Sequence, residues 1–125
     1  MKKVFVVAAH PDDEVLGCGG TLLKHVDNGD KVYVLFISEG VSGRYLNKNS
    51  KKCKNEISER KNMAKKASNF GGFEIVDFLD LKNLELENYP HNYITNIIYK
   101  YFKKYTPDVV YTHYENDLNI DHNQA

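Results

Sequence analysis

Apolar runs rich in β-branched and aromatic residues alternate along the chain with segments whose apolar positions recur at helical spacing. The runs that predict strands are residues 3–9, 31–38, 73–81 and 108–113. The segments that predict helices are residues 14–28, 51–69 and 90–105. Near-continuous apolar strands separated by amphipathic helices are typical of a parallel sheet that is buried on both faces.

This alternation predicts an α/β fold, a Rossmann-like, doubly wound parallel sheet in three α/β/α layers with right-handed crossovers. A strand order of 3-2-1-4 would place the first and fourth strands side by side, where the winding of the sheet reverses. Ligands of such sheets bind beyond the carboxyl ends of the strands at that point. The 125 residues suffice for one domain, so a single domain over residues 1–125 is expected.

The segments between the predicted strands contain residues typical of helix ends and loops. Asn28-Gly29 and Gly71-Gly72 are typical helix ends, and Pro90 suits the first turn of the third helix. The polar residues 39–50 predict a long loop that borders the site. Glycines 17, 19 and 20 match neither GxGxxG nor a Walker loop, so we expect them to let the first helix approach the sheet closely.

Charge and cysteine content narrow the function classes. Acidic and basic residues number 17 each, which removes the electrostatic argument for nucleic acid as a partner. The lysine-rich segment 48–66 is interpreted as a solvated helix face. Cys18 and Cys53 show no CxxC spacing, and Val4–Ala9 is too short for a signal peptide or a membrane segment, so a cytoplasmic protein is expected. Nothing in the sequence bears on oligomerisation.

Candidate chemistry gathers after the first and fourth predicted strands. The polar residues at these two positions are His10, Asp12, Asp13, Glu14, His113, Glu115, Asp117, Asn119, Asp121 and His122. Two histidines and a carboxylate can hold a catalytic zinc ion with open positions, and a second carboxylate can act as base for metal-assisted hydrolysis. Acids alone would equally suit the first turn of a helix, but the histidines favour the metal site. The pattern leaves open whether Asp12 or Asp13 is the ligand.

The segments AHPDDEVLGCGGTL (9–22) and THYENDLNIDHNQA (112–125) together resemble the PIG-L/LmbE-like family of zinc-dependent sugar N-deacetylases. The resemblance implies that His10, Asp13 and His122 bind one Zn²⁺ per chain. It further implies that Asp12 is the general base that activates zinc-bound water for attack on an N-acetyl carbonyl.

Further roles follow from the same resemblance. Arg60 corresponds to an arginine near the substrate, and Arg44 in the 39–50 loop is a second candidate for a phosphate or hydroxyl. Asn119 stands where many members have a histidine that stabilises the oxyanion, which implies a shift in mechanism. Asp121 is expected to orient a ligand or Asn119, and His113 to contribute a donor to the substrate.

The predicted function is therefore removal of an acetyl group from an N-acetylglucosamine-type sugar conjugate. The alternatives are a non-catalytic metal- or sugar-binding module, a nucleotide-binding oxidoreductase that would need GxGxxG after the first strand, and an inactive fragment of the deacetylase. Members of the family are typically close to twice this length. The domain is therefore expected to be truncated after its fourth strand, which would leave an open apolar edge.

Overall fold

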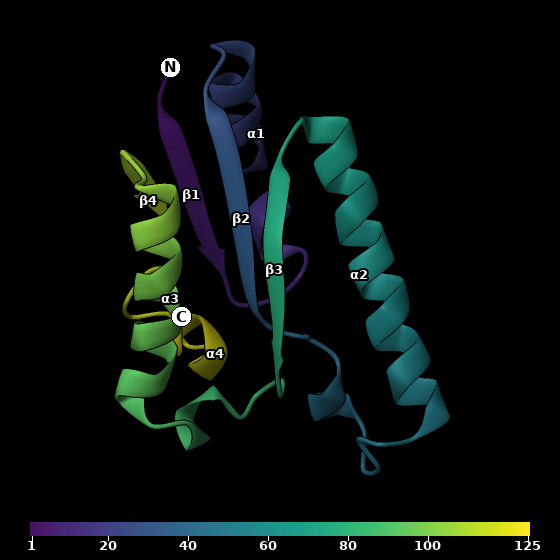
Figure 1. The fold of residues 1–125 in the computed structure, drawn as a ribbon. Coiled ribbons are helices and arrows are strands. Elements are labelled where there is room, and N and C mark those ends of the chain that lie inside the picture. The colour runs from purple at the N-terminus through teal and green to yellow at the C-terminus, as the bar shows by residue number, and fades with distance from the viewer.

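The computed structural model describes all residues 1–125 and has one parallel sheet in the order β3-β2-β1-β4, as the sequence predicts (Figure 1). The strands are β1 (Lys3–Ala8), β2 (Lys31–Ser38), β3 (Glu74–Leu81) and β4 (Val109–Tyr111). The helices are α1 (Asp13–Asp27), α2 (Lys51–Gly71), α3 (His91–Tyr105) and α4 (Ile120–Gln124), with short 3-10 turns η1 (Ser42–Arg44) and η2 (Leu86–Asn88). The predicted α/β fold with β1 beside β4 is confirmed.

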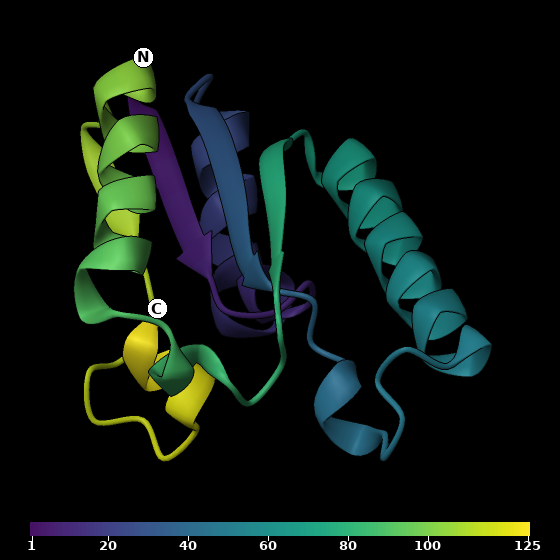
Figure 2. The same ribbon diagram turned by 60° about the horizontal axis from the view of Figure 1, so that its bottom comes forward.

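Helices cover both faces of the sheet, which confirms the three layers (Figures 1 and 2). On one face, Val4, Val6 and Ala8 of β1 join a core with α1 and α2. On the other face, Phe5 and Val7 of the same strand join a core with α3. Alternate side chains of β1 thus enter two cores, so the central strand is buried throughout and holds its carboxyl end in a fixed place.

Both ends of α2 are capped, and the C-terminal cap is the one that Gly71-Gly72 predicts. Ser50 caps α2 by accepting a hydrogen bond from the backbone N–H of Cys53 at 3.2 Å. Gly72 ends the same helix in the left-handed region, with φ of 72°. These ends fix α2 so that its first turns lie at the carboxyl side of the sheet, next to the 39–50 loop (Figure 2).

The glycines of α1 do not serve the close packing that we expected. A β-carbon at Gly17 or Gly20 would meet no atom within 4 Å, and at Gly19 it would meet only atoms of its own helix. Instead, α1 is kinked at Cys18, where φ is −146° and ψ is 17°. Flanking glycines ease such a kink because they lack a side chain to resist it.

The C-terminal segment also differs from the prediction. β4 has three residues, and Thr112 and His113 lie outside it because pairing with β1 stops at Val6 and Tyr111. Beyond this pairing, the backbone N–H of Ala9 donates a hydrogen bond to Nε2 of the His113 imidazole at 2.9 Å. A short helix that the apolar pattern did not predict, α4, begins at Ile120 and includes His122.

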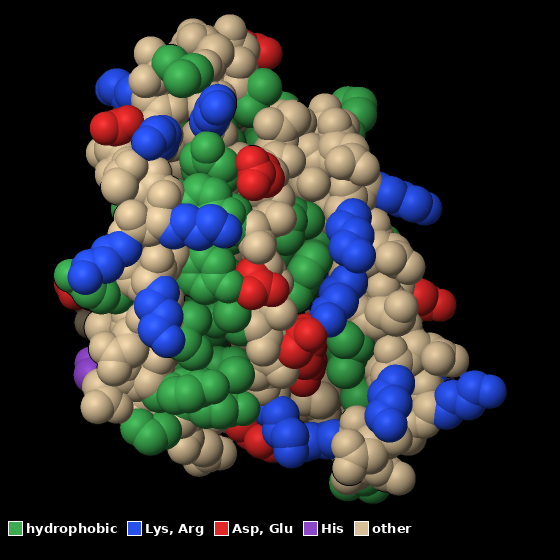
Figure 3. Space-filling model, in the orientation of Figure 1, with side chains coloured by type: hydrophobic (Ala, Val, Ile, Leu, Met, Phe, Trp, Pro, Cys, Tyr) green, Lys and Arg blue, Asp and Glu red, His purple; other side chains and the backbone are tan.

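Surface charge on the face in Figure 3 is spread rather than gathered in one patch, with acidic side chains among the lysines. On α2, Lys61 pairs with Asp80 at 2.5 Å. This distribution agrees with the interpretation of the basic segment as a solvated helix face. No helix combines the length and apolar character needed to cross a membrane.

The buried Glu39 carboxylate organises the 39–50 loop. It accepts hydrogen bonds from the backbone N–H groups of Val41 at 2.6 Å, Ser42 at 3.0 Å and Asn83 at 3.0 Å. The Ser42 hydroxyl also donates to it. One side chain thereby joins the loop after β2 to the loop after β3.

We expect Glu39→Ala to lower the free energy of unfolding by about 2–4 kcal/mol, because it leaves several buried donors without an acceptor. Urea unfolding measures this difference. Glu59→Ala, at an exposed position of α2, is the control and should change stability by less than about 0.5 kcal/mol. Equal stability of the two variants would contradict the role assigned to Glu39.

Candidate metal centre

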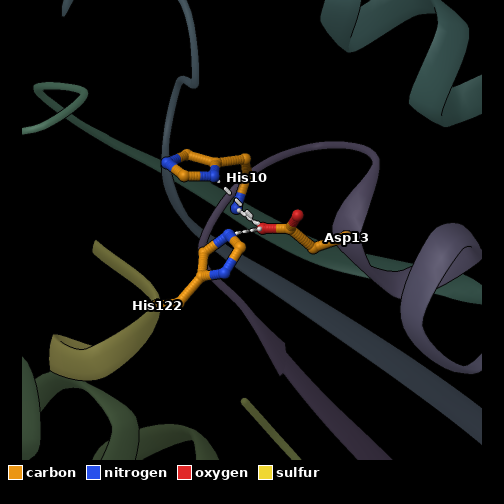
Figure 4. A group of neighbouring side chains, drawn as sticks. All are labelled: His10, Asp13 and His122. Carbon is orange, nitrogen blue, oxygen red and sulfur yellow. Dashed lines mark hydrogen bonds and ion pairs between the residues drawn. The ribbon is translucent and has the colours of Figure 1, made fainter. Parts of the chain in front are cut away.

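Three side chains from separate elements meet at the carboxyl ends of β1 and β4. His10 lies in the turn after β1, Asp13 begins α1 and His122 lies in α4. Figure 4 shows the two imidazoles and the carboxylate pointing toward one another. The structure brings together, at the reversal of the sheet, the three residues that the resemblance implies as ligands.

The spacing of this trio suits one metal ion. Asp13 Oδ2 lies 3.2 Å from His10 Nδ1 and 3.2 Å from His122 Nε2. The three candidate ligand atoms lie within 4.8 Å of one another. Zinc bonds of roughly 2.0–2.2 Å in a tetrahedron require ligand atoms about 3.4 Å apart. The trio therefore needs little rearrangement to bind zinc through three ligands, with a fourth position open.

Each histidine of the trio has a further carboxylate beside its other ring nitrogen. His10 Nε2 lies 2.8 Å from Asp121 Oδ2, and His122 Nδ1 lies 3.1 Å from Asp117 Oδ2. With zinc bound at Nδ1 of His10 and Nε2 of His122, each imidazole would donate its remaining N–H to this carboxylate partner. Metal-binding histidines commonly have such partners, which fix the tautomer and raise the basicity of the ligand. This donor set fits a resident zinc ion.

Asp121 is completely buried and is the most tightly held of these partners. Its Oδ2 accepts the backbone N–H of Leu84 at 2.7 Å in addition to the His10 contact, and its Oδ1 accepts the N–H of Leu86 at 3.3 Å. The carboxylate thereby links α4, the segment before η2 and the turn after β1. The expectation that Asp121 orients a ligand agrees with this geometry.

In the absence of a metal, the charges around the trio shift the pKa values of His10 and Asp13. Burial of His10 opposes its charged form, but Asp121 and Asp13 outweigh burial and raise the pKa of the imidazole to about 9. Burial also opposes ionisation of Asp13, yet His10 and His122 hold its pKa below the usual range. The pKa of the neighbouring Glu14 rises to about 7, chiefly through burial, and its Oε2 has no hydrogen-bond partner.

A second group of possible ligands, His113, Asp117 and His122, lies alongside the first. In this second group, one nitrogen of each histidine already has a hydrogen-bond partner: His113 Nε2 accepts the Ala9 N–H, and His122 Nδ1 donates to Asp117. The His113 ring stacks on His122 with centroids 4.1 Å apart, and burial together with His122 lowers its pKa. The first trio is thus the better site, and His113 serves as a neutral neighbour whose Nδ1 keeps the N–H.

Asp12 lies beside the trio without joining it. It occupies the cap position before α1, but its side chain makes no capping hydrogen bond. The carboxylate instead accepts from Arg60 Nη1 at 3.1 Å, and 43% of the side chain stays exposed. The structure therefore places Arg60 next to the expected base and leaves Asp12 open to an incoming ligand.

The other predicted site residues have structural contacts of their own. Asn119 Oδ1 accepts the backbone N–H groups of Asp121 at 2.9 Å and His122 at 3.3 Å, and so caps α4. Arg44 is 58% exposed and pairs with Glu56 at 3.2 Å, away from the trio. Asn119 thereby positions His122, and its amide nitrogen has no protein partner.

Asp117 was named among the polar residues after the fourth predicted strand, but no role was predicted for it. We expect Asp117→Asn to weaken zinc binding by about 10- to 100-fold, because its amide has one acceptor oxygen and would face the His122 N–H with its N–H₂ group. The Asn119 N–H, which now donates to Asp117 Oδ1 at 2.8 Å, would keep its acceptor. Competition with a chromophoric chelator measures the affinity. Glu115→Gln, in the same loop, is the control and should bind zinc like the unaltered protein.

The sequence and the fold both match known proteins. The family model described as PIG-L, GlcNAc-PI de-N-acetylase, matches residues 5–125. No curated protein sequence matches the chain. Among solved structures, the N,N'-diacetylchitobiose deacetylase from Pyrococcus horikoshii is 25% identical, with a TM-score of 0.81 over 98% of this chain and 46% of that one.

Two further solved structures cover all of this chain. The 4-carboxy-2-hydroxymuconate hydratase from Pseudomonas putida is 26% identical, with a TM-score of 0.77 and 52% of its length covered. A conserved protein from Thermus thermophilus is 28% identical, with a TM-score of 0.74 and 52% covered. The chain thus spans about half the length of the structures it matches.

Proposed function

The chain belongs to the PIG-L family, and on this premise we propose that it carries the centre of a zinc-dependent hydrolase. The proposed reaction removes the acetyl group from an N-acetylglucosamine-type sugar conjugate. The observation that carries the proposal is the trio of His10, Asp13 and His122, whose two imidazoles are each oriented by a carboxylate. A similar deacetylase from Pyrococcus horikoshii supports the substrate class.

A bound zinc ion would supply positive charge at the substrate carbonyl and lower the pKa of a water from about 15.7 toward roughly 7. Asp12, adjacent in sequence to Asp13, is proposed to take the proton of that water as it attacks the carbonyl carbon. Arg60 holds the Asp12 carboxylate in place at 3.1 Å. The proton then passes from Asp12 to the departing amine, so the base is restored within one turnover.

Stabilisation of the oxyanion is proposed to involve Asn119. Its Oδ1 is occupied by the α4 backbone, which leaves the amide N–H₂ as the available donor. An amide can donate a hydrogen bond but cannot supply a proton. The proton for the amine therefore has to come from Asp12, and the single carboxylate serves both steps.

The similarity to a hydratase shows that a fold of this kind also hosts addition of water to a different class of substrate. The family match favours deacetylation. A metal- or sugar-binding module without catalysis would need the trio but would have no use for a free carboxylate beside it. We further propose a reducing compartment such as the cytoplasm, because Cys18 and Cys53 are both unpaired.

Release of acetate by the zinc-loaded protein from a panel of N-acetylglucosamine conjugates tests the proposal. The panel includes free sugars, glycosides and sugar nucleotides, and the His10→Ala variant provides the blank. We expect acetate above the blank from at least one conjugate. No release from any of them, with zinc shown to be bound, would overturn the proposed function.

A further inference from the structure

Two hollows lie near the metal centre, one lined in part by Arg60 and the other in part by Asp13. A groove of about 790 Å³ runs along α2 on the Arg60 side, lined by charged and amide side chains such as Lys52, Asn55 and Glu59. A cavity of about 370 Å³ lies between β1, β4 and the first turns of α1. Its lining combines apolar residues such as Val6, Ala8 and Cys18 with the buried acid Glu14, and Asp13 and His113 also line it. Arg60 thus connects the charged groove to Asp12, and Asp13 connects the cavity to the trio.

The groove has a preformed wall. Arg44 pairs with one carboxylate oxygen of Glu56, and the Tyr45 hydroxyl donates to the other. These contacts attach the 39–50 loop to α2. Since Arg60 lines the groove and also binds Asp12, the groove meets the metal centre at the proposed base. A polyhydroxylated amine would find donors and acceptors along this side.

The direction of the substrate follows from the proposed reaction, on which this inference rests. In amide hydrolysis, the water oxygen bonds to the carbonyl carbon, the C–N bond breaks, and the amine leaves with a proton. Asp12 is the proposed source of that proton, so the amine half must lie on the Asp12 and Arg60 side. The acyl half extends from the same carbonyl carbon away from the amine, toward Asp13 and His113, where the cavity opens.

The cavity is far larger than an acetyl group requires. The methyl group of acetyl is about the size of one water molecule, whose share of liquid volume is about 30 Å³. The cavity has about 370 Å³ and falls within the range of ligand pockets. We propose that this cavity is an acyl pocket, and that the centre hydrolyses amino sugars carrying N-acyl groups of several carbons as well as N-acetyl groups.

Gly17 lines the acyl pocket without contributing a side chain to it. Gly17 and Cys18 both line it, and Cys18 is the residue at which α1 is kinked. A β-carbon at Gly17 would meet no atom within 4 Å, so the first carbon of a side chain can be added there without a clash. Gly20 has the same freedom, lies on the same helix and does not line the pocket. The chain therefore offers a matched pair of positions.

The test compares Gly17→Leu with Gly20→Leu on N-acetyl and N-hexanoyl derivatives of one amino sugar. For the unaltered protein we expect kcat/KM for hexanoyl to equal or exceed that for acetyl, by up to about tenfold, because buried methylenes add binding free energy. Gly17→Leu should lower kcat/KM for hexanoyl about tenfold or more and change that for acetyl less than about twofold. Gly20→Leu should change neither.

A second readout needs no turnover. Calorimetry with the zinc-loaded protein compares acetate with hexanoate, and hexanoate should bind more tightly to the unaltered protein but not to Gly17→Leu. Hydrolysis of the acetyl derivative alone, or equal binding of the two acids, would overturn the acyl pocket and leave the deacetylase intact. Tighter hexanoate binding without hydrolysis of any derivative would support the pocket and overturn the proposed function.

Discussion

Asp12→Asn is expected to lower kcat for deacetylation by about 10²–10⁴-fold while zinc stays bound. The amide cannot take a proton from water or return one to the amine. It keeps the size of the side chain and an oxygen for the Arg60 contact, now 3.1 Å long. Because the trio contains no atom of Asp12, the zinc affinity should change less than about threefold, well below the loss typical of an altered ligand partner. Acetate release and a zinc titration on the same preparation measure both quantities.

The outcome of this substitution separates the candidate roles of the acids after β1. Asp27→Asn, at the exposed end of α1, is the control and should leave both quantities unchanged. Loss of zinc together with activity would make Asp12 a ligand. Full activity would place the base elsewhere, with Glu14 the next carboxyl in the chain. A purely metal-binding module is supported if the unaltered protein binds zinc equally well and releases no acetate.

The sheet could be predicted from the sequence because its central strands are buried on both faces. A run such as Lys31–Ser38 has to be apolar at nearly every position, and its burial is continuous after the first residue. The predicted fourth strand was too long, because β4 pairs with one neighbour over only three positions. Apolar character alone does not show where this pairing stops. α4 has five residues, too few for a helical repeat, and it depends on the Asn119 cap.

The candidate site could be predicted in part for a similar reason. His10 and Asp13 are neighbours in the sequence, and the topology of a doubly wound sheet brings the segment after β4 beside them. The partners that orient the imidazoles depend on side-chain packing instead. The contact between Asp121 and His10 spans 111 positions, and the Asp117 contact arises from the path of the loop before α4. No spacing rule predicts either of them.

The glycines after the acids show how a plausible interpretation of sequence can fail. Glycine is favoured both where a helix packs closely on a sheet and where a cavity has to stay open. The two cases differ in the space around the position of an added β-carbon. At Gly17 that space is empty and borders the cavity beside Asp13. The same residue that was expected to tighten the fold therefore becomes the position from which the acyl pocket can be tested.

Asp121→Ala is expected to have the largest effect on the folded centre. Removing this fully buried carboxylate leaves the N–H groups of Leu84 and Leu86 unpaired and leaves His10 without its partner. In the metal-free protein at neutral pH the His10 imidazole is charged, because its pKa is about 9. Breaking one side of a buried ion pair costs about 3–5 kcal/mol of unfolding free energy, which urea unfolding without metal would measure.

Zinc affinity should fall in the same variant by about 10- to 100-fold, since nothing then holds the lone pair of His10 Nδ1 toward Asp13. Asp121→Asn is the graded comparison: it keeps an acceptor oxygen for one or two of the three donors, so its losses should lie between those of the alanine variant and the unaltered protein. Asp27→Ala, exposed on α1, should change neither stability nor affinity. If Asp121→Ala lost stability but bound zinc normally, the carboxylate would support the loops alone. If it lost affinity without stability, the ion pair would serve the metal and contribute little to the fold.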